Sequence, residues 1–209
     1  KIALSGDGFS KHNKKKLFTG RHALRFAHLQ RYKSDSILIG QKTFNDDNPK
    51  LDSRIEGIKK KIKIFSINQQ LKINPQVLKN PSLRNSHIFH NCKDRERVRK
   101  LGKLFKLIRF DFNEDEVCHR ILKIIYKLNC KKILIEGGIH TLESFLKAKL
   151  INELYVVKNK HFFKKHGLLN ARRFINSLKI KPNEIISLEE NTILKYKPRY
   201  VYRDNTKYR

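Results

Sequence analysis

Apolar and polar residues follow two different periods along the chain, and the two periods alternate. Short apolar runs bounded by Gly, Asn or charged residues predict strands. Longer stretches with apolar residues three and four positions apart predict amphipathic helices. The predicted strands are 1–5, 36–40, 61–67, 86–91, 131–138, 152–159 and 191–197; the predicted helices are 21–32, 114–129 and 140–150, and 93–106 is a charged amphipathic stretch.

The order of these elements predicts the fold class. Strands that alternate with helices are typical of an α/β fold with a mostly parallel central sheet flanked by helices. Thr19 is the expected N-cap of the first helix and Asn113 that of the second, which carries acidic residues in its first turn. We expect one domain over residues 1–196, followed by a basic, Tyr-containing tail over 197–209.

Charge is the most unusual feature of the composition. The 209 residues include 48 Lys and Arg against 19 Asp and Glu, a formal net charge of +29. Such a charge attracts nucleic acid, anionic membranes or phosphorylated small molecules. Compositional drift is the other interpretation, because Lys, Ile and Asn abound throughout the sequence. No run of about 18 apolar residues is present, so we expect no membrane-spanning helix.

The cysteines and histidines predict no metal site. Cys92, Cys118 and Cys130 form no CxxC pair, which favours a reducing compartment and structural thiols. His87 and His90 flank two apolar residues, a pattern more typical of a strand than of metal ligands. No signal peptide is visible, and the chain starts inside an apolar pattern, so we expect a fragment or a processed product.

Candidate chemistry lies where predicted strands end, because ligands of open parallel sheets bind beyond the carboxyl ends of the strands. The first such segment is "SGDG", the second "GQKTFNDDNPKLDSR" and the third "EGG". Each of them alone is equally compatible with a simple turn or a surface loop. Their polar and glycine residues suit phosphate and sugar recognition, the glycines by letting the backbone approach a ligand.

Taken together and in order, the segments resemble a known family. The motifs "KIALSGDG", "LFT", "HLQR", "SILIGQKT", "DDNPKLDSR" and "IEGG" are similar to those of the reductase domain of the bacterial bifunctional riboflavin-biosynthesis deaminase/reductase. That family belongs to the dihydrofolate-reductase-like superfamily. The resemblance implies its fold and an oxidoreductase activity, with NADPH reducing the ribosyl group of 5-amino-6-(5-phosphoribosylamino)uracil to the ribityl form. It further implies a homodimer and a cytoplasmic location. The zinc-ligand motifs of the family's deaminase half, H-x-E and P-C-x-x-C, do not occur in this sequence, so we expect no deaminase chemistry from these residues.

The resemblance also implies roles for individual residues. Asp47 would assist proton transfer to the phosphorylated ribosylaminopyrimidine substrate. The substrate-binding residues would be Lys15, Arg31, Asp47, Leu51, Arg54 and Glu136, with Lys1 lining the same cleft. NADPH would contact Ser5, Asp7, Gly40, Thr43, Gly137 and Gly138.

Several positions depart from the family pattern. Gly6 stands where Leu or Met is usual, Leu17 replaces an aromatic residue, and Asn48 replaces the second Asp before Pro49. Together with the +29 charge, these departures keep a second hypothesis open. In it, the domain has lost turnover and serves as an RNA- or ribonucleoprotein-binding component, for example in an organellar matrix.

Overall fold

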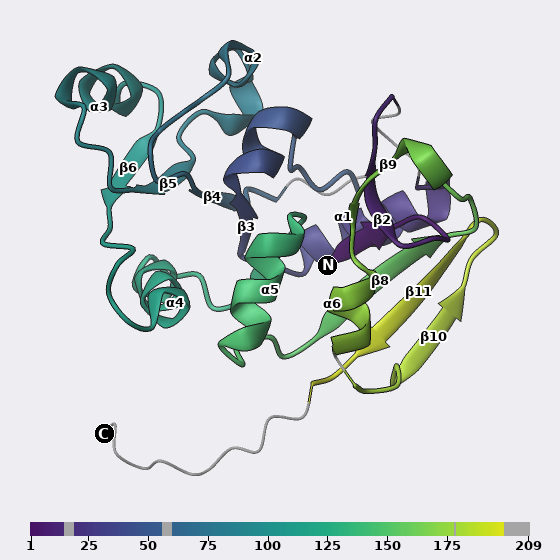
Figure 1. Ribbon diagram of the computed structural model, residues 1–209. Helices are drawn as coiled ribbons and strands as arrows, with labels where there is room; N and C mark the ends of the chain where they lie inside the picture. Colours follow the sequence, from purple (N-terminus) through teal and green to yellow (C-terminus); the bar gives the residue numbers. More distant parts are fainter. Residues whose placement is uncertain (15–18, 56–59, 178, 199–209) are drawn as a thin grey trace, which may run out of the picture.

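A parallel sheet of five strands forms the larger half of the protein. We describe a computed structural model, which covers residues 1–14, 19–55, 60–177 and 179–198. The strand order is β6-β5-β4-β3-β7, and all neighbouring strands are parallel. The strands are β3 (Ser36–Gly40), β4 (Lys63–Ile67), β5 (His87–His90), β6 (Lys106–Arg109) and β7 (Ile133–Ile135) (Figure 1). The predicted mostly parallel α/β architecture is confirmed.

A second, mixed sheet continues from the first. Its order is β1-β8-β11-β10, with β1 and β8 parallel and the other pairs antiparallel. Its strands are β1 (Ile2–Leu4), β8 (Leu154–Asn159), β10 (Glu184–Ser187) and β11 (Asn191–Tyr196). The N–H of Gly137 donates to the carbonyl of Lys1 at 3.3 Å, which joins the end of β7 to the start of β1. A short antiparallel ribbon of β2 (Phe9–His12) and β9 (Gly167–Asn170) stands beside this junction.

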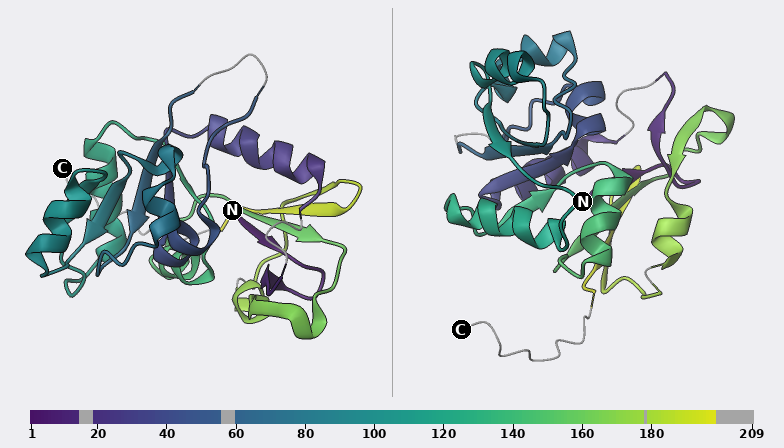
Figure 2. Two further views of the ribbon diagram at one scale, coloured as in Figure 1. Left: turned by 90° about the horizontal axis from the view of Figure 1, so that it is seen from above. Right: turned by 60° about the vertical axis from the view of Figure 1, so that its left-hand side comes forward.

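Helices cover both faces of the parallel sheet, as the two views of Figure 2 show. Successive side chains of β3 point to opposite faces of the sheet. Leu38 packs in the apolar cluster on one face, and Ile37 and Ile39 pack in the cluster on the other. The Leu38 cluster contains residues of α4 (Val117–Lys127) and α5 (Ile139–Lys147). The other cluster contains residues of α2 (Pro75–Leu78), α3 (Arg95–Gly102) and the turns η1 (Thr43–Asp47) and η2 (Pro81–Leu83). The remaining elements are α1 (Arg21–Tyr32), α6 (Arg172–Ser177) and η3 (Lys164–His166).

The structure corrects both predicted helix caps. Gly20, not Thr19, precedes α1, and its N–H donates to the Oδ1 of Asn191 at 2.9 Å. Asn113 lies outside α4, which begins only at Val117; the Asn113 N–H donates to the carboxylate of Asp111. Long-range contacts therefore decided where the first helix begins, and a local turn displaced the start of the second.

Four short strands were not predicted from the sequence. They are β2, β6, β9 and β10, each of four residues. β6 begins at the last residue of the charged amphipathic stretch 93–106, and β2 begins directly after the "SGDG" segment. Four residues are too few to display a period, so neighbouring strands define these elements. Lys15, Leu17 and residues 199–209 of the predicted tail lie outside the described residues.

The remaining sequence expectations concern cysteines, histidines and membrane spans. Cys92, Cys118 and Cys130 are free thiols, and Cys92 and Cys130 are buried. His87 and His90 are buried in β5, as the strand interpretation requires. Across the part of the chain that the structure describes, no helix is both long and apolar enough to cross a membrane.

Asp7 ties the turn after β1 to the segment after β8. Its carboxylate accepts hydrogen bonds from the Ser5 hydroxyl at 2.6 Å and from the N–H groups of Phe163 and Lys164 at 3.0 and 2.7 Å. Burial would raise the pKa of Asp7, but these three hydrogen bonds outweigh it and lower the pKa below its ordinary value. The carboxylate therefore stays ionised and stabilises the fold near neutral pH.

We expect Asp7→Asn to lower the free energy of unfolding by about 1–3 kcal/mol at pH 7, because an amide presents an N–H₂ group to one backbone donor. The lowered pKa fixes the sign of the pH dependence. The contribution is complete above the unfolded-state pKa of about 3.9 and disappears as the pH falls through the lower folded-state value. Urea unfolding at several pH values measures it. The exposed Asp111→Asn is the control, and equal losses in both variants would contradict the assignment.

Candidate active site

A cavity of about 670 Å³ opens beyond the carboxyl ends of β3 and β7. The β2–β9 ribbon contributes residues to its wall, as do η1 and the start of α5. This is the edge at which ligands of parallel sheets bind. The lining residues that carry the site are Lys1, Lys11, Lys14, Arg31, Gly40, Lys42, Thr43, Asp46, Asp47, Leu51, Glu136, Gly137, Gly138, His140 and Thr141.

Glycines at the ends of two strands allow neighbouring segments to pack closely around this cavity. A Cβ atom at Gly40 would lie only 2.4 Å from the Oγ1 of Thr141, so α5 approaches the end of β3 at a distance that a side chain would prevent. Gly137 and Gly138 have φ angles of +67° and +60°, in the region that favours glycine. A Cβ at Gly137 would also meet the Oγ1 of Thr43 at 3.0 Å.

The Gly137–Gly138 turn leads directly into α5. The first hydrogen bond of this helix turn runs from the N–H of Leu142 to the carbonyl of Gly138 at 3.1 Å. The preceding amides, at Gly138, Ile139 and His140, therefore have no acceptor within the helix. Amides in this position, together with the positive end of the helix dipole, suit an anionic group such as a phosphate.

A buried ion pair forms the floor of the cavity. Glu136 is 5% exposed, and its carboxylate accepts from the Nε and Nη2 of Arg31 at 3.0 and 2.8 Å. The Nζ of Lys1 lies 3.5 Å from the same carboxylate. Burial alone would raise the pKa of Glu136, but Lys1 and Arg31 overcome that effect and lower it to about 2. Glu136 is therefore an anion at every physiological pH and cannot donate a proton.

Asp46 and Asp47 lie on the opposite side, in η1. The Nζ of Lys11, from the β2–β9 ribbon, lies 3.0 Å from Asp46 and 3.9 Å from Asp47. The side chain of Asp47 is about half exposed and lines the cavity. Leu51 is buried with a φ of 53°, and packs beneath this loop in the apolar cluster that also holds Phe44. The loop thus presents a carboxylate to the cavity from a fixed apolar base.

The charges that line the cavity favour anionic ligands. Five Lys and Arg residues face three carboxylates, and His12 and His140 add further nitrogen atoms. The site is neither closed by basic side chains nor uniformly basic. Such a mixture suits a ligand with both phosphate and hydroxyl groups.

Eight of the twelve residues predicted as site residues line this cavity, namely Arg31, Gly40, Thr43, Asp47, Leu51, Glu136, Gly137 and Gly138. Ser5 and Asp7 do not; their side chains bond to each other and to the segment after β8. Arg54 does not either, because its guanidinium is exposed and pairs with Asp52 at 3.1 Å. Lys15 lies outside the described residues.

Sequence reasoning missed the cavity residues Lys11, Lys42, Asp46 and Thr141. Lys42 and Asp46 lie in the segment "GQKTFNDDNPKLDSR", but no pattern distinguishes them from surface charges. Lys11 lies after the segment "SGDG", among other basic residues. Thr141 is one polar residue at the start of a predicted helix, and only its approach to Gly40 reveals its place.

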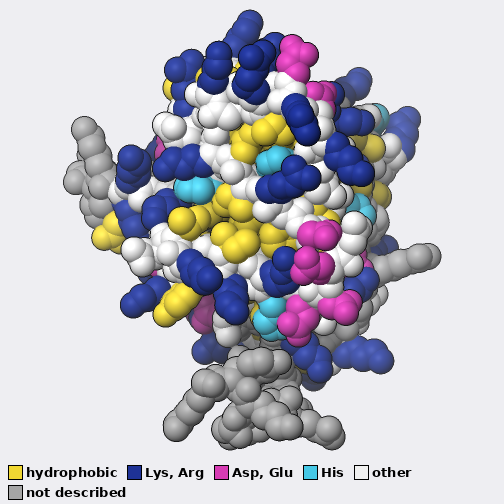
Figure 3. All heavy atoms as spheres, turned by 90° about the vertical axis from the view of Figure 1, so that its left-hand side faces the viewer, with side chains coloured by type: hydrophobic (Ala, Val, Ile, Leu, Met, Phe, Trp, Pro, Cys, Tyr) yellow, Lys and Arg dark blue, Asp and Glu magenta, His cyan; other side chains and the backbone are white. Residues whose placement is uncertain are grey.

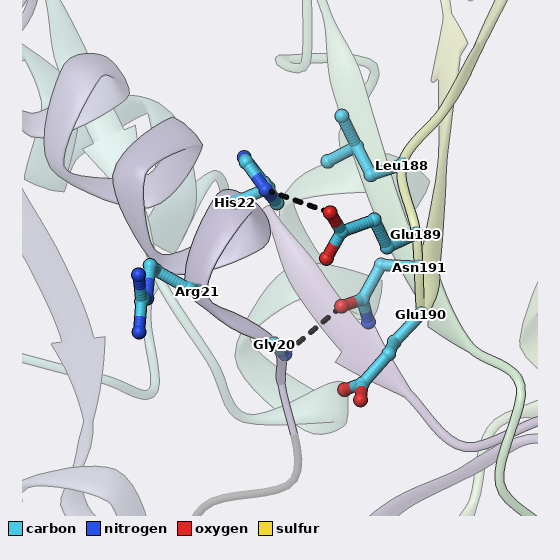
Figure 4. A pocket seen from close by; sticks show the side chains of 7 residues that line it. All are labelled: Gly20, Arg21, His22, Leu188, Glu189, Glu190 and Asn191. Carbon is cyan, nitrogen blue, oxygen red and sulfur yellow. Dashed lines mark hydrogen bonds and ion pairs between the residues drawn. The ribbon is translucent and has the colours of Figure 1, made fainter.

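A smaller cavity, of about 350 Å³, lies between the start of α1 and the turn from β10 to β11 (Figure 4). The ring of His22 points toward Glu189, with 3.5 Å between Nε2 and Oε1, and the amide of Asn191 points toward Gly20. None of the predicted site residues lines it. These contacts position α1, and through it Arg31, against the second sheet.

The sequence is similar to that of known proteins over almost its whole length. The family model described as the RibD C-terminal domain matches residues 1–201. Riboflavin biosynthesis protein RibD from Aquifex aeolicus is 25% identical over 189 residues, which are 87% of this chain and 51% of that protein. The chain therefore spans about half the length of this curated relative.

Several solved structures share the fold. RibD from Acinetobacter baumannii superposes with a TM-score of 0.73 at 19% identity, over 95% of this chain and 56% of that one. A pyrimidine reductase-like protein from Corynebacterium diphtheriae gives a TM-score of 0.71 at 14% identity, over 95% of this chain and 90% of that one. The predicted dihydrofolate-reductase-like fold is thereby confirmed.

We expect Glu136→Gln to lower the free energy of unfolding by about 3 kcal/mol, because it leaves the charges of Arg31 and Lys1 without a buried partner. The ion pair stabilises the fold fully above the unfolded-state pKa of about 4.3, and its contribution fades as the pH falls toward the folded-state value. The difference in the free energy of unfolding between the variant and the original protein should therefore be constant from pH 8 to about 5 and shrink below about 4.

Urea unfolding across this pH range provides the measurement. Glu143→Gln is the matched control, since Glu143 lies on the neighbouring helix α5 in an exposed pair with Lys147 at 3.1 Å. This control should lower the free energy of unfolding by less than about 0.5 kcal/mol. A Glu136→Gln deficit as small as that of the control would refute the role given to this pair.

Proposed function

Because the chain belongs to the RibD C-terminal domain family, we propose that it is a reductase of riboflavin biosynthesis. Its substrate is the ribosyl group of 5-amino-6-(5-phosphoribosylamino)uracil, which it converts to the ribityl form with NADPH. One observation carries this proposal: eight predicted site residues from separate segments of the chain line one open cavity.

Several features of the cavity support a nicotinamide dinucleotide as its cofactor. Gly40 and Gly137 let the side chains of Thr141 and Thr43 pack directly against the strand ends, which places both threonines at the cavity wall. The amides at the start of α5 and the ammonium of Lys42 suit its phosphates. Gly40, Thr43, Gly137 and Gly138 would hold the cofactor, and bound NADPH would supply the hydride.

The Arg31–Glu136 pair would orient the sugar phosphate. Hydrogen bonds to Glu136 and to the carbonyl of Asp52 use three of the five N–H donors of Arg31. The others can reach a substrate oxygen while the pair keeps the guanidinium in place. Since Arg54 is turned toward Asp52, Arg31 and the ammonium groups of the lining are the closer candidates for the phosphate.

Asp47 would assist the proton transfer that accompanies reduction. The reacting carbon C1′, in the open imine form of the sugar, must approach the hydride donor to about 3–3.5 Å. Ring opening would break the bond between C1′ and the ring oxygen, hydride would add to C1′, and one proton would have to reach the opened ring oxygen or the nitrogen to give the neutral amine. Asp47 is half exposed at the cavity wall and can relay this proton directly or through water. Glu136 is excluded from that role because its pKa is held at about 2.

NADPH should bind the protein saturably, and the binding should survive physiological salt, because buried amides and shape contribute as well as charge. Titration followed by nicotinamide fluorescence at two salt concentrations measures it. An RNA oligomer serves as comparator. Absence of NADPH binding, together with tight and steeply salt-dependent RNA binding, would replace the reductase by a binding module.

Asp47→Asn should retain NADPH binding and lower kcat by about 10²–10⁴-fold, the usual loss when a general acid or base is removed. Steady-state oxidation of NADPH with the ribosylaminopyrimidine phosphate measures this effect. Asp115→Asn, at an exposed position before α4, is the matched control and should keep full activity. An Asp47→Asn enzyme with unchanged kcat would remove Asp47 from the mechanism.

A further inference from the structure

The two edges of the parallel sheet carry charge of opposite sign. The segments that enter its strands, 33–35, 60–63, 84–86, 103–106 and 128–132, contain nine Lys and Arg and one Asp. The segments that leave the same strands, 41–47, 68–72, 91–96, 110–116 and 136–140, contain four Lys and Arg and nine Asp and Glu. Drift toward Lys in the composition would not sort the charges in this way.

The topology gathers the basic segments into one row. All five strands are parallel, so every entering segment lies at the amino edge, and every leaving segment at the cavity edge. Lys63 pairs in register with Ser36, which pairs on its other side with Ile133, the residue after Lys132. Lys106 pairs with His87. Five strands spaced by about 4.8 Å make this edge roughly 19 Å long.

The single acidic residue of this edge, Asp35, is occupied by the backbone. Its Oδ2 accepts from the N–H groups of Lys131 and Lys132 at 2.9 and 2.8 Å. The hydrogen bond from the Lys132 N–H is the main cause that lowers the pKa of Asp35. The hydrogen bond from Lys131 and the nearby charges of Lys60 and Lys132 lower it further. The carboxylate thus holds β7 beside β3, and it leaves the surrounding ammonium groups in large excess.

Helix dipoles account for part of this row only. Lys33 and Lys103 are C-caps of α1 and α3, where a cation is favourable. The Nζ atoms of Lys60 and Lys63 donate to the carbonyls of Tyr32 and Leu128, at the ends of α1 and α4. The basic residues with neither explanation are exposed: Lys61, Arg84, Lys106, Lys131 and Lys132.

An aromatic side chain stands at the same edge. Tyr126 is 62% exposed in the last turn of α4, two residues before the carbonyl that binds Lys63. Tyr32, at the end of α1, lies under the ammonium of Lys60 at 5.6 Å from the ring centre. Exposed rings among cations are the combination that binds unpaired bases and their phosphates.

We propose that the amino edge of the parallel sheet, defined by Lys33, Lys61, Lys106, Lys131, Lys132 and Tyr126, binds single-stranded nucleic acid. This edge is separated from the cavity by the length of the strands, roughly 16 Å for the five residues of β3. The two sites can therefore be occupied together. Figure 3 shows one face of the molecule, on which Lys and Arg are widely spread and Asp and Glu lie at the lower right and at the top.

The test compares two quadruple variants of the full chain that lose the same charge. Lys33→Gln, Lys61→Gln, Lys106→Gln and Lys131→Gln remove exposed cations of the amino edge. Lys72→Gln, Lys93→Gln, Lys158→Gln and Lys181→Gln remove exposed cations elsewhere. Binding of a labelled single-stranded RNA oligomer and of a DNA oligomer of the same sequence is measured against salt concentration.

The amino-edge variant should bind at least about tenfold more weakly, and the slope of log K against log salt should fall by about 3 for four lost contacts. The control should change less than about twofold in Kd, and the corresponding four Lys→Arg substitutions should restore binding. Tyr126→Ala should weaken binding by about fivefold or more, because stacking on one base is lost.

Equal losses in both quadruple variants would show that net charge alone drives binding and would overturn the proposal. The proposal would also be overturned if these lysines bound phosphatidylserine vesicles or a poly-Glu peptide while neither the RNA nor the DNA oligomer bound. Both quadruple variants should keep NADPH binding, which separates a failure of this proposal from a failure of the reductase proposal.

Discussion

The buried pair of Arg31 and Glu136 is the interaction on which the arrangement of the site depends. Arg31 is near the end of α1, and Glu136 is the first residue after β7, 105 positions away. Their two hydrogen bonds connect the helix that packs on the second sheet to the end of the parallel sheet. Because Glu136 lies next to Gly137, the same pair fixes where the glycine turn and the start of α5 stand.

A buried ion pair of this kind contributes specificity of arrangement more than net stability, since desolvation of both charges opposes their attraction. Here the pair gains from the second cation, Lys1, and from the carbonyl of Asp52, to which Arg31 also donates. The Asp52 contact draws the loop after η1 toward the cavity. One guanidinium thus connects the strand end, the helix and the loop that carries Asp47, and each of these contributes a wall of the site.

Part of the distribution of charge follows from the direction of the strands. Helices that connect parallel strands begin at the cavity edge and end at the amino edge, so their dipoles favour acids at the first and bases at the second, but they do not account for Lys61, Lys106, Lys131 and Lys132. The lining of the cavity reverses this trend locally, because Lys42, just before η1, is joined there by Lys1, Lys11 and Lys14. These cations come from the start of the chain, from β2 and the residues after it, and from the end of β3, so the anion-binding character of the cavity depends on where they are placed more than on the net charge.

By itself, the sequence determined the α/β class, the buried strand at 36–40, the helix at 21–32 and the glycines at strand ends, because each depends on short-range periods and on backbone conformations that only certain residues adopt. Only the tertiary structure decided which polar residues meet. Arg54 and Asp7 fit the same local patterns as Arg31 and Asp47, yet Arg54 turns to Asp52 and Asp7 to the amides of Phe163 and Lys164. The partner of Asp7 lies 156 positions away and is brought to it only by tertiary packing, whereas Arg54 pairs with a carboxylate two positions away because the fold places no other acid within its reach among the contacts described.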